Sequence, residues 1–290
     1  MRRWTLVTAV LVTLVLVVSA APHNAAALSI PAAAPVGPGD FYLALGDSLV
    51  TGTELVDDSL PGYPATMAQI LGAVKPSITL HRLGVSGETS LSMLAPAGQL
   101  AQAVAYIATQ RAAGKVVSPV TLDIGGNDMA AVFLQGAATV TNTLTLYRAD
   151  LKIILDTLDA AMTVGGQRQG DLILMNLYNP YPGAVLAPPL VTLAPGQEPI
   201  VTDLAVPLFN QVVAEEAAAR SIPVADAYSA FSGRQPGLVY VKFPYVITAP
   251  INQANFDFHP RPAGHVVLAR AFAEASGYRV PRIWMPVIIQ

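Results

Sequence analysis

The 290-residue sequence predicts a single α/β domain built around a largely parallel sheet. Apolar, strand-like runs alternate with helix-compatible segments along nearly the whole chain, and no repeat or linker divides it. Several of these runs stop abruptly at small polar residues, and open parallel sheets present ligand-binding groups at the carboxyl ends of their strands. Hydrophobic residues make up 53% of the chain and charged residues 12%, which suits one sizeable core.

Five short apolar runs are the predicted strands: Phe41–Leu45, Ser77–Leu83, Pro119–Ile124, Asp171–Leu177 and Pro223–Ala225. Helices are predicted where apolar residues recur every three or four positions, over Pro64–Gly72, Leu91–Ala113, Gly136–Val164, Val201–Arg220 and Ala263–Ala275. The segments richest in proline, glycine or polar residues are predicted loops: Thr51–Leu60, Ala184–Pro199 and Gly233–Asn255. The apolar tail Val280–Gln290 is expected either to pack on the domain or to add an edge strand.

The first 27 residues have the pattern of a secretory signal peptide with its cleavage region. Two arginines precede the uncharged run Thr5–Val18, and small residues follow at Ser19–Ala21. This run of 14 residues is shorter than the roughly 20 that a membrane span needs. We therefore expect a secreted protein, extracellular or in the cell envelope, with a retained N-terminal anchor as the alternative. Residues 28–40 are predicted to be a flexible lead-in, and residues 41–290 to form the domain.

Composition also limits the possible partners. The net charge of −3 and the lack of basic clusters argue against binding to nucleic acid or to anionic membranes. No stable membrane insertion is expected once the signal peptide is removed, and a monomer is expected. The chain has no cysteine, so disulfides, thiolate metal sites, a lipid-anchoring cysteine and a cysteine nucleophile are all excluded.

Four polar blocks stand where predicted strands end or helices begin. They are Gly46-Asp47-Ser48, Gly84–Gly87 (GVSG), Gly125–Asp128 (GGND) and Asp257–Pro260 (DFHP). In a parallel sheet the first three lie on the same edge, and the fourth adds a histidine from the loop before the last helix. One crevice would then hold a hydroxyl, a glycine backbone N–H, a carboxamide and an imidazole.

These groups are the parts that acyl transfer requires. A serine hydroxyl is a weak nucleophile until a base within hydrogen-bonding reach takes its proton. The negatively charged oxygen of the tetrahedral intermediate needs preorganised donors, each worth about 3 kcal/mol where measured. The backbone N–H groups of Ser48 and Gly87 and the side-chain amide of Asn127 are the candidate donors.

With these blocks, the sequence resembles the GDSL or SGNH-hydrolase family of esterases and lipases. The matching segments are Gly46-Asp47-Ser48-Leu49, Gly84–Thr89, Gly125–Asp128 and His259-Pro260 followed by Ala263-Gly264-His265, so the resemblance spans about Phe41 to Phe272. It implies a three-layer, flavodoxin-like α/β/α sandwich that cleaves small-molecule or lipid esters without a metal or organic cofactor. It further implies Ser48 as nucleophile, His259 as base and an oxyanion hole of Ser48, Gly87 and Asn127.

The acid that would orient His259 departs from the family pattern. The family usually places it three residues before the histidine, and Phe256 occupies that position here. The nearest carboxylate is Asp257, which in an extended backbone lies on the same side as His259. We expect Asp257 to take this role; Asn255 or a backbone carbonyl are the alternatives.

Other polar residues near these blocks have more ordinary interpretations. Asp47 is expected to hold its turn through backbone hydrogen bonds, and Asp128 to cap the segment that follows it. His265 is expected to be an exposed or packing residue, and Asp123 is given no role. With four histidines and no His-Glu-x-x-His motif, a catalytic metal is not expected.

Tyr178 and Asn179 follow the fourth predicted strand, at the same edge as the other blocks. They are either part of a strand-terminating turn or substrate-binding residues of the cleft, and the proline-rich and aromatic loops nearby could form its walls. The absence of a Gly-x-Ser-x-Gly motif disfavours an α/β-hydrolase. An acyl- or acetyltransferase, a carbohydrate acetylesterase and a non-catalytic binding module stay open as alternatives to an esterase or lipase.

Overall fold

The computed structural model of the protein describes residues 34–52, 62–135, 137–186, 200–240 and 257–279. The predicted signal peptide and the C-terminal tail lie outside the described residues. So do Asn255 and Phe256, and most of the predicted loops Thr51–Leu60, Ala184–Pro199 and Gly233–Asn255.

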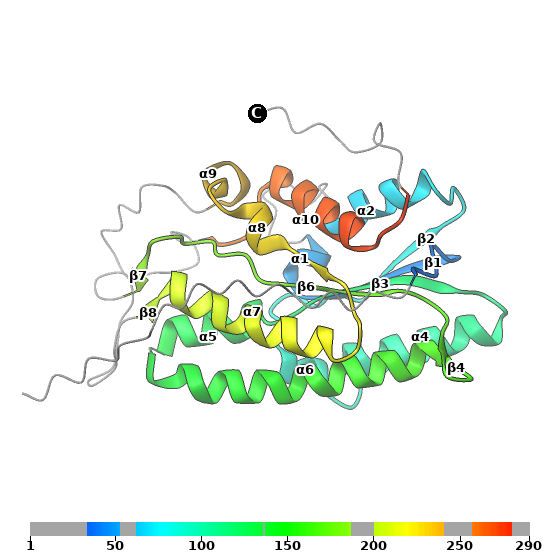
Figure 1. The fold of residues 1–290 in the computed structure, drawn as a ribbon, viewed down its shortest axis with the longest axis horizontal. Helices are drawn as coiled ribbons and strands as arrows, with labels where there is room; N and C mark the ends of the chain where they lie inside the picture. The colour runs from blue at the N-terminus through cyan, green and yellow to red at the C-terminus, as the bar shows by residue number, and fades with distance from the viewer. Residues whose placement is uncertain (1–33, 53–61, 136, 187–199, 241–256, 280–290) are drawn as a thin grey trace, which may run out of the picture. The chain divides into compact units, whose positions relative to one another are not determined.

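A five-stranded parallel sheet forms the centre of the fold, in the order β2-β1-β3-β6-β9 (Figure 1). Its strands are β1 (Phe41–Gly46), β2 (Thr79–Arg82), β3 (Val117–Asp123), β6 (Leu172–Met175) and β9 (Val224–Ala225). All five predicted strands are therefore present, each shorter than or close to its expected length. The pairing of β1 with β3 places Gly46 level with Asp123, so both strands end at the same edge.

Helices cover both faces of the sheet, as Figure 1 shows. One layer holds α2 (Tyr63–Gly72), α8 (Ala227–Phe231), α9 (Gln235–Leu238) and α10 (Pro262–Ala275). The other holds α4 (Gln99–Ala112), α5 (Gly126–Gln135), α6 (Val140–Met162) and α7 (Thr202–Ala218). The predicted three-layer α/β/α sandwich is thus confirmed.

The remaining elements are short. They are α1 (Ser48–Thr51), α3 (Ser90–Met93), the 3-10 turn Ala137–Thr139, the hairpin of β4 (Thr163–Val164) with β5 (Gln167–Arg168), and the antiparallel pair of β7 (Val185–Leu186) with β8 (Ile200–Val201). The elements α1 and α3 each directly follow a strand-end loop that carries a predicted site residue.

The core lies between the sheet and the two helical layers. Every residue of β3 is buried, and so is each residue of β1 after Phe41, because helices cover both faces of these central strands. Fully burying a leucine such as Leu43 or Leu45 contributes about 1.5–3 kcal/mol. In the first helical layer, the ring of Tyr63 stacks on Phe272 at 4.8 Å and ties α2 to α10.

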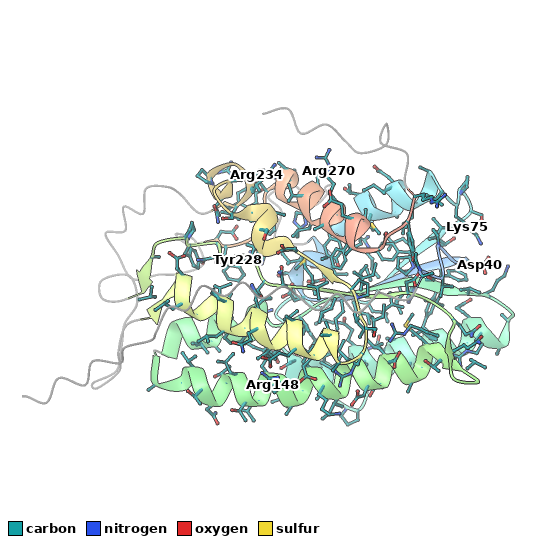
Figure 2. All side chains as sticks on the ribbon, viewed as in Figure 1. Asp40, Lys75, Arg148, Tyr228, Arg234 and Arg270 are labelled. Atoms are coloured by element: carbon teal, nitrogen blue, oxygen red, sulfur yellow. The ribbon has the colours of Figure 1, made fainter. Side chains whose placement is uncertain are left out.

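Ion pairs connect α6 and α7 on the surface of the second helical layer. Arg148 of α6 lies at the edge of the molecule in Figure 2 and forms ion pairs with Glu215 at 2.6 Å and Glu216 at 3.3 Å on α7. Further along α6, Lys152 and Asp156 pair at 2.5 Å. Among the described residues, no helix combines the length and the apolar character needed to cross a membrane.

The helix predicted over Leu91–Ala113 is in fact two helices, α3 and α4. Residues 94–98 separate them because Pro96 lacks a backbone N–H and Gly98 takes the N-cap position of α4. The helix predicted over Gly136–Val164 is shorter, since α6 begins at Val140 and ends at Met162. Gly165 and Gly166, with φ of +57° and +79°, form the turn of a small hairpin rather than a simple helix end.

The end of the predicted lead-in is held to the domain. The backbone N–H groups of Val36 and Gly37 donate to the two carboxylate oxygens of Asp171, each at 2.9 Å. Gly39 donates to the carbonyl of Ser118 at 2.8 Å. Acceptors at the amino ends of the neighbouring strands thus bind the backbone of residues 36–40, and the flexible lead-in over residues 28–40 stays a prediction.

Candidate active site

The end of β1 presents Ser48 at the start of a new helix. Gly46 has a φ of +146°, and a Cβ atom built there would lie 2.3 Å from Oδ1 of Asp123, so only glycine fits this position. Asp47 then caps α1 by accepting the N–H of Leu49 at 3.0 Å, which confirms the predicted role of this carboxylate in the turn. Ser48 is the first residue of α1 and is 5% exposed.

Ser48, His259 and Asp257 form one continuous hydrogen-bonded series. The Oγ of Ser48 lies 2.9 Å from Nε2 of His259, across 211 residues of chain. The Nδ1 of His259 lies 2.6 Å from Oδ1 of Asp257. With the ring proton on Nδ1, donated to Asp257, Nε2 is free to accept the proton of Ser48.

The acid reaches His259 through a local turn. Oδ1 of Asp257 accepts the backbone N–H of His259 at 2.9 Å in addition to the bond from the ring. An aspartate that accepts the N–H two residues later forms an Asx-turn, which folds its side chain back along the chain. This turn explains how a carboxylate two residues before the histidine, rather than three, meets the imidazole.

The hydrogen bonds of Asn127 bring it to the neighbours of the other two predicted oxyanion donors, Ser48 and Gly87. Asn127, near the start of α5, donates from Nδ2 to the carbonyl of Glu88 at 2.9 Å and to Oδ2 of Asp47 at 3.2 Å. These bonds place its amide between the residue after Gly87 and the residue before Ser48. Among the described residues, nothing accepts the backbone N–H of Ser48 or that of Gly87. A substrate oxygen would thus meet two unused donors and an amide whose longer bond it can share.

Gly87 owes its identity to backbone conformation. Its φ is +81°, a region that favours glycine, and the space where a Cβ would stand is open. A side chain there would therefore be strained by the backbone and would project beside the N–H that is the predicted oxyanion donor.

Gln99, at the start of α4, is a supporting residue that sequence reasoning missed. Its Oε1 accepts the N–H of Gly46 at 2.6 Å, and its Nε2 donates to the carbonyl of Gly46 at 2.8 Å and to Oε2 of Glu88 at 3.0 Å. It thereby joins the turn Gly46-Asp47-Ser48 to the loop of Gly87. The sequence carries no signal for this role, because glutamine is common at exposed helix positions and this one is buried.

Asp128 supports the same loop from α5. Its two carboxylate oxygens accept the N–H of Ser90 at 3.0 Å and the Oγ–H of Ser90 at 2.6 Å. The predicted capping of the following segment is replaced by a bond to the preceding polar block, because Ser90 begins the helix that directly follows the Gly87 loop.

Tyr178 and Asn179 lie at the site edge, but their polar atoms contact protein. The hydroxyl of Tyr178 donates to the carbonyl of Phe258 at 2.9 Å, next to His259. The amide of Asn179 donates to Asp203 at 2.8 Å and its oxygen accepts the N–H of Tyr181 at 2.9 Å. These bonds fit a strand-terminating turn that also braces the His259 loop; substrate binding by this pair stays a prediction.

His265 is a packing residue within α10. It is buried, and its Nδ1 accepts the N–H of Tyr63 at 3.1 Å. Burial, followed by the nearby His259, lowers the pKa of His265 to about 4, so this imidazole is neutral near pH 7. Within the described residues, no group of three histidine, aspartate or glutamate side chains is arranged to hold a metal ion.

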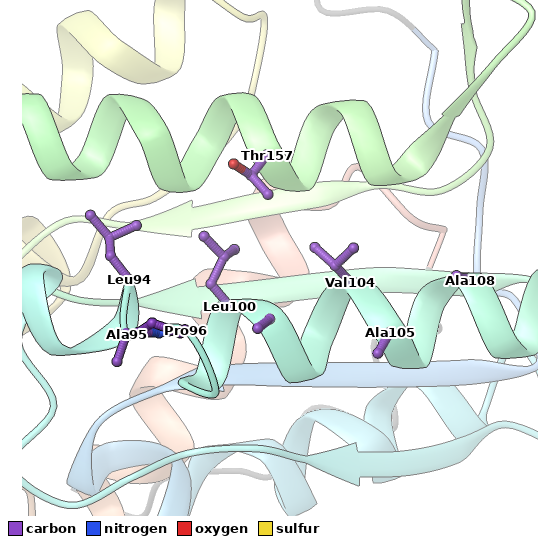
Figure 3. Close-up of a pocket in the computed structure, with 9 residues that line it drawn as sticks. Leu94, Ala95, Pro96, Leu100, Val104, Ala105, Ala108 and Thr157 are labelled. Atoms are coloured by element: carbon purple, nitrogen blue, oxygen red, sulfur yellow. The ribbon is translucent and has the colours of Figure 1, made fainter.

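A separate apolar groove of about 450 Å³ runs between α4 and α6 (Figure 3). Its lining includes Leu94, Leu100, Val104 and Thr157, and none of the predicted site residues. It therefore lies apart from Ser48, His259 and Asp257.

Comparison with known proteins identifies the family of the chain. The profile of the GDSL-like Lipase/Acylhydrolase family matches residues 44–267. No curated protein matches the chain significantly.

Among solved structures, the lipase Lip_vut3 from a goat rumen metagenome has a similar fold, with a TM-score of 0.58. The two sequences are 19% identical over 82% of this chain and 97% of the lipase. The acetylxylan esterase Axe2 from Geobacillus stearothermophilus gives a TM-score of 0.56 at 20% identity, over 86% of this chain and 99% of Axe2.

Variants of Axe2 at a serine, an aspartate and a histidine have been solved as catalytic mutants, and that aspartate precedes its histidine by three residues. Because the family profile covers most of the chain in a single stretch, this protein belongs to the GDSL-like lipase/acylhydrolase family, a family of ester hydrolases.

Proposed function

We propose that this ester hydrolase works by a serine mechanism, through an acyl-enzyme formed on Ser48. The observation that carries the proposal is the hydrogen-bonded series from Ser48 Oγ through His259 to Asp257. A nucleophile, a base within 2.9 Å and a carboxylate that orients the base are the three parts of a serine hydrolase.

In the acylation step, Ser48 Oγ attacks the carbonyl carbon of the ester while Nε2 of His259 takes the hydroxyl proton. The carbonyl electron pair moves onto its oxygen, which the N–H groups of Ser48 and Gly87 and the Asn127 amide then stabilise. When the intermediate collapses, the bond between carbon and the alcohol oxygen breaks. His259 returns its proton to that oxygen, and the alcohol leaves.

Deacylation repeats these steps with water as nucleophile. His259 takes a proton from the water as it attacks the acyl carbon, and Ser48 Oγ leaves with the proton that His259 returns. Asp257 orients the imidazole of His259 and stabilises the imidazolium that forms in each half-reaction. An alcohol in place of water would give acyl transfer with the same groups.

A carbohydrate acetylester is the second candidate substrate. The likeness of fold to an acetylxylan esterase favours it, just as the likeness to a lipase favours an ester with an acyl chain. The natural ester is therefore a matter for direct assay over both classes.

The decisive experiment treats the purified protein with a fluorophosphonate probe and assays p-nitrophenyl esters of increasing chain length, with Ser48→Ala as the control. We expect labelling at Ser48 and ester cleavage, both lost in the variant, with kcat reduced at least about 10⁴-fold. A protein that neither takes the label nor cleaves any ester, including acetylated sugars, would refute the serine mechanism and favour a non-catalytic binding module.

Export is part of the proposal. The arginines, the uncharged run Thr5–Val18 and the small residues Ser19–Ala21 support a signal peptide within residues 1–27, followed by a lead-in and one domain over residues 41–290. N-terminal sequencing of the protein from a culture medium or envelope fraction tests this. A start between Ala21 and Ala27 supports cleavage, and an intact Met1 in the membrane fraction indicates an anchor.

A further inference from the structure

A buried polar cluster lies directly beneath the turn that carries Ser48. It consists of two carboxyl groups, Asp47 and Asp123, with Tyr42, Tyr63 and Thr121 around them, and none of the five is more than 5% exposed. The mechanism proposed above uses none of these side chains. Buried carboxyl groups are costly unless they are paired and hydrogen-bonded, so their arrangement requires an explanation.

The contacts of the two carboxyl groups differ in kind. Asp47 accepts from two groups of the site: the N–H of Leu49 at 3.0 Å and the amide of Asn127 at 3.2 Å. Asp123 accepts the hydroxyl of Tyr63 at 2.7 Å and, over a long 3.4 Å, the N–H of Asp47. Asp47 therefore faces the oxyanion donors, and Asp123 supports it from the end of β3.

Behind Asp123 the hydroxyl groups continue into the core. Thr121, two residues earlier on β3, lies 3.3 Å from the hydroxyl of Tyr63 and 3.0 Å from that of Tyr42. These three hydroxyls connect β1, α2 and β3 in one network, and each can donate and accept. Such a network can satisfy one buried carboxyl group without supplying a positive charge.

Within the described part of the chain, no ion pair neutralises the two carboxyl groups. Among the described residues, neither Asp47 nor Asp123 contacts a lysine or an arginine. The titratable groups that face them from the surrounding elements are Tyr42 on β1, Tyr63 on α2, Asp128 on α5, Tyr178 after β6 and His259 before α10. Two neighbouring buried carboxylates without a cation cannot both stay ionised at neutral pH.

The contacts favour Asp123 as the protonated partner, because Asp47 accepts two N–H donors while Asp123 accepts the hydroxyl of Tyr63 and only a long bond from the N–H of Asp47. Burial, and then the charge of Asp47, raise the pKa of Asp123 well above the ordinary range of an aspartate. Burial also raises the pKa of Asp47, but the N–H of Leu49 and a hydrogen bond from Asp123 oppose that rise. Asp47 is thus the ionised partner, in keeping with its acceptance of two N–H donors from the site.

We propose that Asp123 is a positioning residue whose protonated carboxyl group donates to Asp47 and holds that carboxylate on Leu49 and Asn127. The proton ties the end of β3 to the nucleophile turn and so fixes the N–H of Ser48 and the amide of Asn127. When the proton is lost at high pH, the two carboxylates repel each other and the turn shifts. The kinetic part of this inference rests on the serine mechanism proposed above; the protonation does not.

The first test is infrared difference spectroscopy of the full-length protein at neutral pH. The spectrum of the wild type minus that of Asp123→Asn should contain the carbonyl stretch of a protonated carboxylic acid. Asp156→Asn is the matched control, because Lys152 and Arg220 lower the pKa of Asp156 and keep it ionised. If the wild type loses only carboxylate bands on substitution of Asp123, the proposal is wrong.

The second test separates charge from shape. Asp123→Asn keeps a neutral side chain with a donor, so kcat on a p-nitrophenyl ester should stay within about threefold of wild type and its decline at alkaline pH should disappear. Asp123→Ala removes the support and should lower kcat about tenfold to 100-fold with little change in KM, as expected when reacting groups are misplaced. Equal kcat in wild type and Asp123→Ala, or an Asp123→Asn variant as impaired as Asp123→Ala, contradicts the positioning role.

A third readout does not need turnover. The side-chain amide resonances of Asn127, assigned by their absence in Asn127→Ala, should shift in Asp123→Ala and stay close to wild type in Asp123→Asn. If the wild type cleaves no ester, the serine mechanism fails, while the infrared band and these resonances still decide the inference about Asp123. Unshifted Asn127 resonances in Asp123→Ala would overturn it.

Discussion

An aspartate lies at or beside each end of β3, but only at the carboxyl end do backbone donors lack an acceptor among the described residues. At the amino end, Asp171 lies beside Ser118; at the carboxyl end, Asp123 lies beside Asp47. The two clusters belong to the same central layer, and each joins a strand end to a preceding segment of chain. The difference lies in what surrounds each carboxyl group.

At the amino end, donors saturate the carboxylate. Asp171 accepts the N–H groups of Val36 and Gly37 at 2.9 Å each and the hydroxyl of Tyr278 at 2.7 Å. Ser118 in turn donates to the carbonyl of Gly37 at 2.7 Å and accepts the N–H of Asp171 at 3.0 Å. This cluster is closed, so it holds the chain near residue 36 and offers no group to a ligand.

At the carboxyl end, the polar groups outnumber their partners. Asp123 has a second carboxyl group, Asp47, as its neighbour, whereas Asp171 has backbone N–H donors. The N–H groups of Ser48 and Gly87 have no acceptor among the described residues. A buried polar cluster that satisfies itself stabilises the fold, whereas one that leaves donors aimed at a crevice can stabilise a charge that arrives with a substrate. This contrast, rather than the presence of charged residues, marks the active edge of the sheet.

The largest effect expected at the active end comes from Asp257. Asp257→Ala should lower kcat by about 10⁴-fold with little change in KM, because His259 loses the carboxylate that sets its tautomer and stabilises its charge. Steady-state kinetics on a p-nitrophenyl ester gives both constants, and a matching circular dichroism spectrum excludes unfolding. Unchanged turnover would remove Asp257 from the catalytic series.

Acid should weaken the same end of the molecule through His265. Its pKa in the folded protein is about 4, below the value near 6.5 of an unfolded chain. The unfolded state thus binds more protons between these values, and stability falls as the pH drops from about 6.5 to 4, by about 3 kcal/mol at most from this group. Protonation also removes the acceptor of the Tyr63 N–H.

Urea unfolding of wild type and His265→Gln at several pH values measures this contribution. The variant should be less stable near pH 7 but should lose less stability on acidification, because its side chain does not titrate. Parallel curves for the two proteins would show that His265 does not couple folding to pH.

The smallest effect is expected at the closed amino end. Asp171→Ala leaves two backbone N–H groups and the hydroxyl of Tyr278 without their acceptor, which should cost about 1–3 kcal/mol of unfolding free energy. The kcat and KM on esters should stay at wild-type values. Asp159→Ala, which removes a partly exposed ion pair with Arg168, is the control and should cost about 1 kcal/mol or less. A loss of kcat in Asp171→Ala would mean that the two ends of β3 are coupled.

Much of the fold follows from where apolar runs stop. The strand ending at Gly46-Asp47-Ser48 is readable from sequence because few residues other than glycine and short polar ones fit a tight strand-to-helix turn. The break near Pro96 was missed because the helical spacing of apolar residues continues across it. Because Pro96 has no backbone N–H, the helix is interrupted there even though the apolar spacing over Leu91–Ala113 predicts a continuous one.

The site was predictable only where chemistry restricts the residue type. Ser48 and His259 stand out because few other side chains could do their work, and the structure brings them together as expected. Gln99 and Asp123 are buried and contact residues that are distant in the sequence. The sequence does not distinguish a buried glutamine or aspartate from an exposed one. Their roles therefore depend on tertiary structure.

The separation of 211 positions between Ser48 and His259 has a consequence for the order of events during synthesis. Asp257 and His259 are close in the sequence and form a local turn. Ser48 is synthesised much earlier than either of them. A nascent chain that has already exposed Ser48 and the strands around it still lacks the base. Under the serine mechanism proposed above, a chain can cleave esters only after His259 has been synthesised and brought to Ser48.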